Sequence, residues 1–275
     1  MTRSSVWDVA EKPSQVQRRG RYLPDSMPHP AKMLPALAAT AVEAYTGPGD
    51  LVLDPMCGIG TTLVEAAHLG RDAIGIEYEP RWAALAQANV GHARDHGAAG
   101  RAEVLVGDCR HLRSVVPADA AGQVAMILTS PPYGASTHGR IRTGSQCVRK
   151  SDYRYSADRA NLAHRGLDEI LASMTAMFRE ASFVLSPGGV VVLTARPYRR
   201  FGVLVDLPGR LVGAAEAGGF ELVERNVALL CARRRDRLVP RASFFQLNEV
   251  RRARQHGAPL RVIAHEDVLV FARAS

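Results

Sequence analysis

The chain has 275 residues, of which 47% are hydrophobic and 23% charged, with a formal net charge of +8 and an isoelectric point near 9.7. This length allows one α/β domain with a substantial core, and the basic excess favours an anionic partner such as nucleic acid, although a GC-rich coding bias also enriches arginine. The four cysteines lack metal-ligand or C-x-x-C spacing, and no apolar run reaches about 18 residues. We therefore expect a cytoplasmic chain with no metal site, disulfide framework or membrane span.

The first 30 residues are polar and proline-bearing, and they include the basic cluster Arg18-Arg19-Gly20-Arg21. Their irregular pattern predicts a basic arm over residues 1–30 rather than a folded element, so the folded domain is expected over residues 31–275. Its first element is a helix over residues 31–45, which ends at the turn sequence TGPG.

Short β-type runs then alternate with helical segments. The strands are expected at 51–54, 73–77, 102–106, 124–128 and 189–194, and the helices at 62–69, 81–92 and 167–185. This alternation predicts right-handed crossovers and a mainly parallel sheet that is covered on both faces. Two later strands, at 221–230 and 267–271, are separated by an insertion over 231–262.

Polar residues follow the predicted strands, at the edge where open parallel sheets bind ligands. The first strand ends in Asp54, and Gly58 and Gly60 follow just before a helix N-terminus, so the backbone there can approach a ligand closely. Glu77 ends the second strand, where it can accept hydrogen bonds from two ribose hydroxyls, and Asp108 follows the third, where it can accept one from an adenine amine. Each acid alone is as well explained as a helix cap or a turn carboxylate. Together they favour a binding site.

The segment TSPPYG at residues 129–134 follows the strand at 124–128. Two consecutive prolines restrict the backbone and remove two N–H donors, so the Ser130 hydroxyl and the Ser130 and Pro131 carbonyls are displayed as acceptors beside the Tyr133 ring. The exocyclic amine of a nucleobase, with two N–H donors on a flat ring, is a fitting partner for this turn.

The order DPMCGIGT, GIEYEP, GD and TSPPYG resembles the S-adenosylmethionine-dependent amino-methyltransferases of the (D/N/S)PPY type. The segments HPAKM at 29–33 and HEDVLVF at 265–271 are similar to the family's segment beneath the methionine end of the cofactor and to its last strand. The resemblance implies a Rossmann-like class I fold with a seven-stranded, mainly parallel sheet and an antiparallel last strand. It also implies S-adenosyl-L-methionine as cofactor and catalysis by Ser130, Pro131, Pro132 and Tyr133. The cofactor-binding residues that it implies are His29, Asp54, Met56, Gly58, Gly60, Thr61, Glu77 and Asp108.

The residues around the turn narrow the acceptor. Carbon-5 methylation of cytosine needs a thiolate in a Pro-Cys pair, and no cysteine here follows a proline. Serine before PPY is commoner among the family's cytosine-N4 enzymes, so DNA cytosine N4 is the favoured target. The segment order, with the cofactor loop before SPPY, is also that of tRNA guanosine-N2 methyltransferases, which keeps an RNA substrate open. A nucleic-acid-binding protein that keeps the cofactor pocket without turnover is a further alternative.

Two segments outside the alternation are rich in arginine. Residues 135–165 predict a loop that closes over the substrate, and the insertion at 231–262 carries nine arginines against two acids. A solvated insertion without a binding role is the competing interpretation; the number of subunits stays open. The residues expected to contact phosphates are Arg140, Arg142, Arg233, Arg234, Arg235, Arg237, Arg251 and Arg252.

Overall fold

The structure is a computed structural model that describes residues 4–30, 32–132, 140–143, 148–151, 155–200, 202–242 and 244–274. Tyr133, one of the predicted catalytic residues, lies outside the described residues. Arg140 and Arg142 lie on a described strand, β6 (Arg140–Thr143), which pairs with β7 (Val148–Ser151), but their side chains are outside the description.

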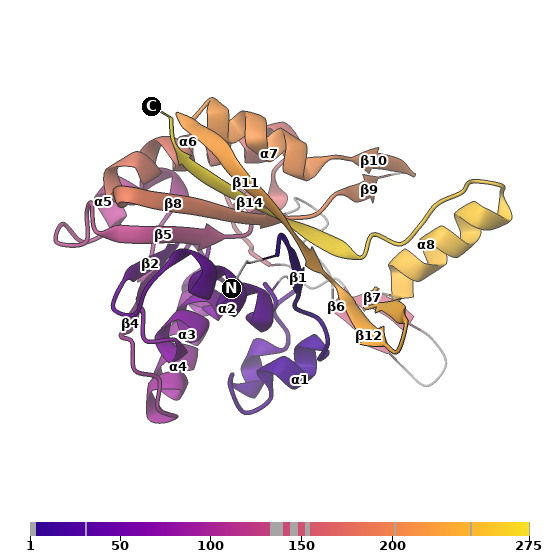
Figure 1. The fold of residues 1–275 in the computed structure, drawn as a ribbon, viewed down its shortest axis with the longest axis horizontal. Helices are drawn as coiled ribbons and strands as arrows, with labels where there is room; N and C mark the ends of the chain where they lie inside the picture. Colours follow the sequence, from indigo (N-terminus) through magenta and orange to yellow (C-terminus); the bar gives the residue numbers. More distant parts are fainter. Residues whose placement is uncertain are drawn as a thin grey trace.

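The centre of the molecule is an eight-stranded sheet in the order β1-β11-β14-β8-β5-β2-β3-β4 (Figure 1). β14 runs antiparallel to β11 and β8, and every other neighbouring pair of this sheet is parallel. The fold class is therefore as predicted, with one more strand than expected. The strands are β1 (Val6–Asp8), β2 (Leu51–Asp54), β3 (Asp72–Glu77), β4 (Ala102–Val106), β5 (Val124–Thr129), β8 (Leu185–Ala195), β11 (Phe220–Leu229) and β14 (His265–Arg273).

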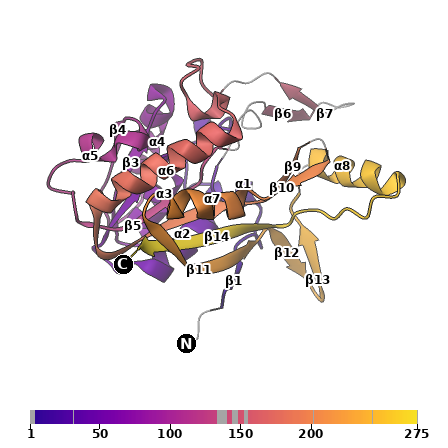
Figure 2. The same cartoon turned by 90° about the horizontal axis from the view of Figure 1, so that it is seen from above.

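Helices cover both faces of the sheet, as Figures 1 and 2 show. On one face lie α2 (Pro35–Tyr45), α3 (Thr61–His68) and α4 (Pro80–Asp95). On the other lie α5 (Leu112–Val115), α6 (Leu167–Val184) and α7 (Leu207–Glu216), the last of which the sequence analysis did not predict. Two apolar cores result, one on each side of the strands, as the strands' continuous apolar runs require.

Helix α6 shows how the sequence pattern builds one of these cores. Its apolar residues recur every three or four positions, so Met174, Phe178 and Ala181 fall on one face and are fully buried. The Phe178 ring packs against Phe220 and Phe271, with ring centroids 5.2 Å apart in both pairs. Truncating such a ring to alanine typically costs about 3–5 kcal/mol of stability.

The N-terminal segment is folded, which corrects the predicted arm. It forms β1, α1 (Ser14–Arg18) and the short helix η1 (Pro24–Ser26), and β1 extends the sheet by pairing with β11. Trp7, Val9 and Tyr22 are buried. Two arginines of the basic cluster are engaged by the fold, because Arg18 is buried and bonds the Met33 carbonyl, and Arg21 pairs with Glu65 at 2.6 Å; Arg19 is exposed.

The predicted insertion forms defined secondary structure between β11 and β14. It consists of the hairpin β12 (Cys231–Arg234) and β13 (Arg237–Pro240), followed by α8 (Phe244–Gln255). Helix α8 extends away from the sheet beyond the carboxyl end of β8 (Figure 1). A second small hairpin, β9 (Tyr198–Arg200) and β10 (Val203–Val205), leads from β8 to α7.

Candidate cofactor and acceptor site

A cavity of about 520 Å³ opens at the carboxyl ends of the parallel strands. Its walls come from the loops after β2, β3, β4 and β5, from the end of β8 and from the first residues of β14. Tyr155 and residues 160–163 also line it, so part of the predicted substrate loop lies against this cavity. Of the predicted catalytic and cofactor-binding residues, those that line the cavity are His29, Asp54, Met56, Gly58, Thr61, Glu77, Asp108, Ser130, Pro131 and Pro132.

The loop after β2 is built around the buried side chain of Asp54. Its carboxylate accepts hydrogen bonds from the Thr62 hydroxyl at 2.6 Å and the Met56 backbone N–H at 3.1 Å. Burial nevertheless raises the pKa of Asp54 from 3.8 to about 6, and these hydrogen bonds only partly oppose the rise. Gly58 and Gly60 in this loop both adopt positive φ, 56° and 80°, which favours glycine.

Gly58 also meets a steric requirement. A Cβ added there would lie 3.1 Å from Nε2 of His29, a buried residue, so any side chain at this position would push against the imidazole ring. The predicted cofactor residues His29 and Gly58 are therefore direct neighbours. Because of this contact, the conformation of the segment before α2 depends on that of the loop after β2.

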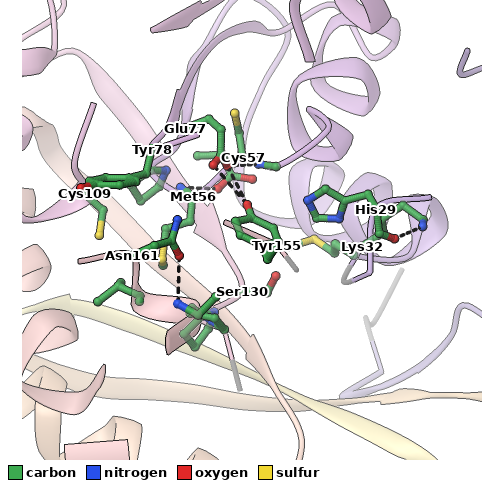
Figure 3. A pocket seen from close by; sticks show the side chains of 18 of the residues that line it. His29, Lys32, Met56, Cys57, Glu77, Tyr78, Cys109, Ser130, Tyr155 and Asn161 are labelled. Carbon is green, nitrogen blue, oxygen red and sulfur yellow. Dashed lines mark hydrogen bonds between the residues drawn. The ribbon is translucent and has the colours of Figure 1, made fainter. Parts of the chain in front are cut away.

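Three hydrogen-bond donors hold the Glu77 carboxyl group in the cavity. It is buried, and its two carboxylate oxygens accept hydrogen bonds from the backbone N–H groups of Gly58 and Glu79, both at 2.9 Å. The Tyr155 hydroxyl lies 3.1 Å from each oxygen (Figure 3). Burial raises the pKa of Glu77 to about 7, because the hydrogen bonds from these donors only partly offset the loss of hydration. Additional donors from a bound ligand would stabilise the ionised carboxylate.

Tyr155 has a role that the sequence analysis did not foresee. Its ring makes edge contacts with His29, at a centroid distance of 5.1 Å, and lies 6.0 Å from Trp82. The Trp82 indole N–H donates to the Tyr155 carbonyl at 3.2 Å. The predicted substrate loop thus contributes an aromatic side chain to the cavity next to Glu77. No sequence pattern indicated this role, because Tyr155 and Glu77 are 78 positions apart.

Asp108 also lines the cavity, where Arg110 already engages it. The guanidinium bonds both carboxylate oxygens, at 2.5–3.0 Å, and the Arg110 backbone N–H donates at 2.9 Å. Burial works to raise the pKa of Asp108, but the hydrogen bonds from Arg110 outweigh it and lower the pKa. Asp108 is therefore an ionised acceptor that any ligand would share with Arg110.

The opposite end of the cavity is formed around the turn after β5. Ser130 is half-buried and faces the cavity from the side opposite Glu77 and His29 (Figure 3). Next to β5, the end of β8 contributes Thr194 and Arg196, and the first residues of β14 contribute Glu266. The three strand-end acids and the Ser-Pro-Pro turn therefore line the same cavity. From the sequence, only their order along the chain was known.

The predicted phosphate-contacting arginines of the insertion differ in their contacts with the N-terminal segment. Arg233 and Arg234 are engaged by the N-terminal segment: the Arg233 backbone N–H and the Arg234 guanidinium both bond Glu11, at 2.7 and 2.6 Å. Both side chains are still more than half exposed, at 67% and 58%, so their contact with phosphates stays a prediction. The side chains of the other four described arginines of this set are exposed as well; they lie at the turn of the β12–β13 hairpin and on α8, namely Arg235, Arg237, Arg251 and Arg252.

Within the described ranges, no three His, Cys, Asp or Glu side chains are grouped so that they could hold a metal ion. A search of the same ranges finds no helix with the length and apolarity of a membrane span. The described cysteines Cys57, Cys109 and Cys231 are all free and buried. Burial raises the pKa of the Cys109 thiol to about 12, so this cavity-lining cysteine is a thiol at neutral pH.

Comparison with known proteins identifies similar sequences. A family model described as "DNA methylase" matches residues 2–88, which include the loop after β2 and Glu77 but end before Ser130. A tRNA (guanine(10)-N2)-dimethyltransferase of Methanocaldococcus jannaschii is 34% identical over 110 residues, or 40% of this chain and 31% of that protein. The Type II methyltransferase M.MjaII of the same organism is 31% identical over 74 residues, or 27% of this chain and 14% of that protein. The chain thus spans less than a third of either relative.

Solved structures share the fold. TrmN from Thermus thermophilus superposes with a TM-score of 0.54 at 20% identity, covering 94% of this chain and 53% of that one. A methyltransferase from Pyrococcus furiosus superposes with a TM-score of 0.50 at 13% identity, covering 88% of this chain and 84% of that one. At these identities the likeness concerns the fold alone.

Proposed function

We propose that this chain is an S-adenosylmethionine-dependent amino-methyltransferase of the (D/N/S)PPY type, which transfers a methyl group to the exocyclic amine of a nucleobase. The similarity to a DNA methylase family, to tRNA guanine-N2 dimethyltransferases and to a type II methyltransferase supports this proposal. The observation that carries the proposal is a cavity lined both by the acids Asp54 and Glu77 and by the Ser130 turn, with Ser130 on the side opposite Glu77. A methyl donor and an amine acceptor have to meet in such a shared space.

The residues present suit S-adenosyl-L-methionine. Glu77 offers two carboxylate oxygens that can bind the two ribose hydroxyls, and Gly58 lets the loop adopt its positive φ without a Cβ that would press on His29, which lines the same cavity. Asp54 would hold the methionine end, with Met56, Gly60 and Thr61 in the same loop, and Asp108 would accept from the adenine amine. When bound, the cofactor supplies an electrophilic methyl group on a sulfonium.

The Ser130 turn would act on the acceptor. The lone pair of an aromatic amine is delocalised into its ring, so the nitrogen is a poor nucleophile unless its N–H bonds are held. The Ser130 hydroxyl and the Pro131 carbonyl are suited to accept these hydrogen bonds and to favour a pyramidal nitrogen that faces the methyl group. Tyr133 is proposed to stack on the base, a contact worth roughly 1–3 kcal/mol, which helps offset the extraction of the base from its stack.

We propose cytosine N4 in DNA as the target. The serine at the first position of the SPPY turn supports it, as does the similarity to a DNA methylase family. The absence of a Pro-Cys pair argues against the covalent route to carbon 5. A second candidate, guanine N2 in RNA, is favoured by the order of the motifs and by the tRNA guanine-N2 dimethyltransferases among the relatives.

Nucleic acid would be held by the exposed arginines of the insertion, which include Arg233 and Arg234. Arg235 and Arg237 on the β12–β13 hairpin, and Arg251 and Arg252 on α8, extend beyond the sheet on the side where the β8 strand ends (Figure 1). Contacts of this kind to phosphates fix register and orientation without reading sequence. Arg140 and Arg142 on β6 are proposed to join them.

The test is incubation of the purified protein with methyl-labelled cofactor and separate pools of DNA, tRNA and rRNA. We expect label in one nucleic-acid pool, and loss of that label in the Ser130→Ala variant, which should still bind S-adenosylhomocysteine. Label found only in protein or in a small molecule would overturn the proposal. Cofactor binding without transfer to any pool would favour a non-catalytic nucleic-acid-binding protein.

A further inference from the structure

Tyr155 occupies the part of Glu77 that the proposed function gives to the cofactor. Its hydroxyl lies 3.1 Å from both carboxylate oxygens of Glu77, so a single O–H group is shared between them (Figure 3). The same two oxygens are proposed to accept hydrogen bonds from the two ribose hydroxyls of S-adenosylmethionine. A side chain of the protein and the ribose of the cofactor therefore need the same acceptors.

The Glu77 carboxylate has no position left for a ribose while Tyr155 is bound to it. A carboxylate offers about four lone-pair positions, two on each oxygen. The backbone N–H of Gly58 takes one position on one oxygen, and that of Glu79 takes one on the other, both at 2.9 Å. The Tyr155 hydroxyl lies between the remaining two. The two neighbouring hydroxyls of a ribose need these same two positions.

The backbone of Tyr155 is held independently of its hydroxyl. Its carbonyl accepts hydrogen bonds from the Trp82 indole N–H, at 3.2 Å, and from the Arg81 guanidinium, both on helix α4. The residues that follow are attached to the same region, because the Tyr78 hydroxyl donates to Asp158 at 2.6 Å. The hydroxyl can therefore leave Glu77 without detaching the segment that carries it.

The ring of Tyr155 is also held by contacts that do not involve its hydroxyl. It makes an edge contact with His29, with centroids 5.1 Å apart, and its centroid lies 6.0 Å from that of Trp82. A phenylalanine at this position would keep both ring contacts and lose the hydrogen bonds to Glu77. The function of the hydroxyl can thus be tested apart from the packing of the ring.

We propose that the Tyr155 hydroxyl is an autoinhibitory contact, which occupies the ribose position on Glu77 and has to be displaced when the cofactor binds. This inference rests on the proposed function, which assigns the ribose to Glu77. The cofactor can displace the hydroxyl because two donors then replace one. In the free protein the contact lowers the apparent affinity, because only molecules in which Tyr155 has left Glu77 are competent to bind.

The contact also links the cofactor to the predicted substrate loop over residues 135–165. Tyr155 belongs to this loop, and residues 160–163 of the loop line the cavity together with Ser130. Binding of the ribose to Glu77 removes a contact of that loop. Cofactor affinity and the arrangement of the loop are therefore coupled, and the coupling is reciprocal.

The experiment measures, by calorimetric titration, the binding of S-adenosylhomocysteine and of its analogue whose ribose lacks both hydroxyls. Only the first ligand has to displace Tyr155 from Glu77. Tyr155→Phe should therefore bind S-adenosylhomocysteine about tenfold more tightly than the unaltered protein does, as expected when one competing hydrogen bond to a charged group is lost. The affinity of Tyr155→Phe for the analogue should stay within about twofold of that of the unaltered protein.

Tyr45→Phe is the matched control. It also removes a hydrogen bond between a tyrosine and a glutamate, the one at 2.6 Å from Tyr45 to Glu224, which joins α2 to β11. It should leave the affinity for both ligands unchanged.

The inference is overturned if Tyr155→Phe binds S-adenosylhomocysteine no more tightly than the unaltered protein, since the hydroxyl would then not compete with the ribose. It is equally overturned if the analogue gains as much affinity as S-adenosylhomocysteine. Absence of S-adenosylhomocysteine binding to the unaltered protein would instead reject the proposed function, and the inference with it.

Discussion

Replacing Asp54 by asparagine should stabilise the protein while it weakens cofactor binding. Asp54 is buried, and burial raises its pKa from 3.8 to about 6. Asparagine has the same shape and carries no charge. Its carbonyl oxygen can keep the hydrogen bond from Met56, and its amide can donate to the Thr62 hydroxyl, which can accept as well as donate.

The size and sign of the effect follow from the two pKa values. An acid with a raised pKa in the folded state destabilises that state wherever it is ionised, so the penalty grows as pH rises from 3.8 and is complete above about 6. A difference of about two pH units corresponds to about 3 kcal/mol. Asp54→Asn should therefore raise the free energy of unfolding by up to about 3 kcal/mol at pH 8, and by less than about 1 kcal/mol at pH 4.

The measurement is urea unfolding of both proteins at pH 4 and pH 8, together with calorimetric titration with S-adenosylmethionine. Affinity should fall because the variant lacks the charge proposed to hold the methionine end. Asp119→Asn, at an exposed position, is the control and should change stability by less than about 0.5 kcal/mol. The reasoning is refuted if Asp54→Asn is destabilised at pH 8, or if its effect is the same at both pH values.

Four further variants test other proposed roles. Ser130→Ala should lower turnover by about 10²-fold with nearly unchanged cofactor affinity, whereas Glu77→Ala should mainly weaken the cofactor; equal loss of cofactor binding in both would contradict these roles. Joint replacement of Arg251 and Arg252 by alanine should reduce the salt-dependence slope of nucleic-acid binding by about 2. The control replaces Arg94, on α4, and Arg101, just before β4, which lie far from α8 (Figure 1), and should leave the slope unchanged. An unchanged slope in the Arg251 and Arg252 variant would mean that α8 has a structural role only. Trp7→Ala should lower the free energy of unfolding by about 3 kcal/mol, whereas a free arm would lose nothing measurable.

The sequence predicted those parts of the fold that depend on local pattern. Strands 51–54 and 102–106 begin and end where they were expected, because each is a short apolar run bounded by polar residues. The shared position of the strand-end acids was predictable as well, because parallel strands bring their carboxyl ends to the same edge of a sheet. Asp54 and Glu77 line one cavity for that reason.

The missed features depend on contacts between distant positions. Trp7 and Val9 are apolar residues without periodicity in a polar segment, and only the edge of the sheet at β11 gives them a place to pack. Tyr155 reaches Glu77, and Glu11 binds Arg234, across long stretches of sequence that no local pattern connects. Such pairs are visible only in three dimensions.

The position of the transferred methyl group tests the central claim most directly. Nucleic acid methylated by this protein would be digested to nucleosides, and the labelled product compared with standards by chromatography and mass spectrometry. The account predicts a methyl group on an exocyclic nitrogen, with N4-methylcytosine as the expected product. A methyl group on a ring carbon or on the ribose would contradict it, because the Ser130 turn would then have no amine to hold.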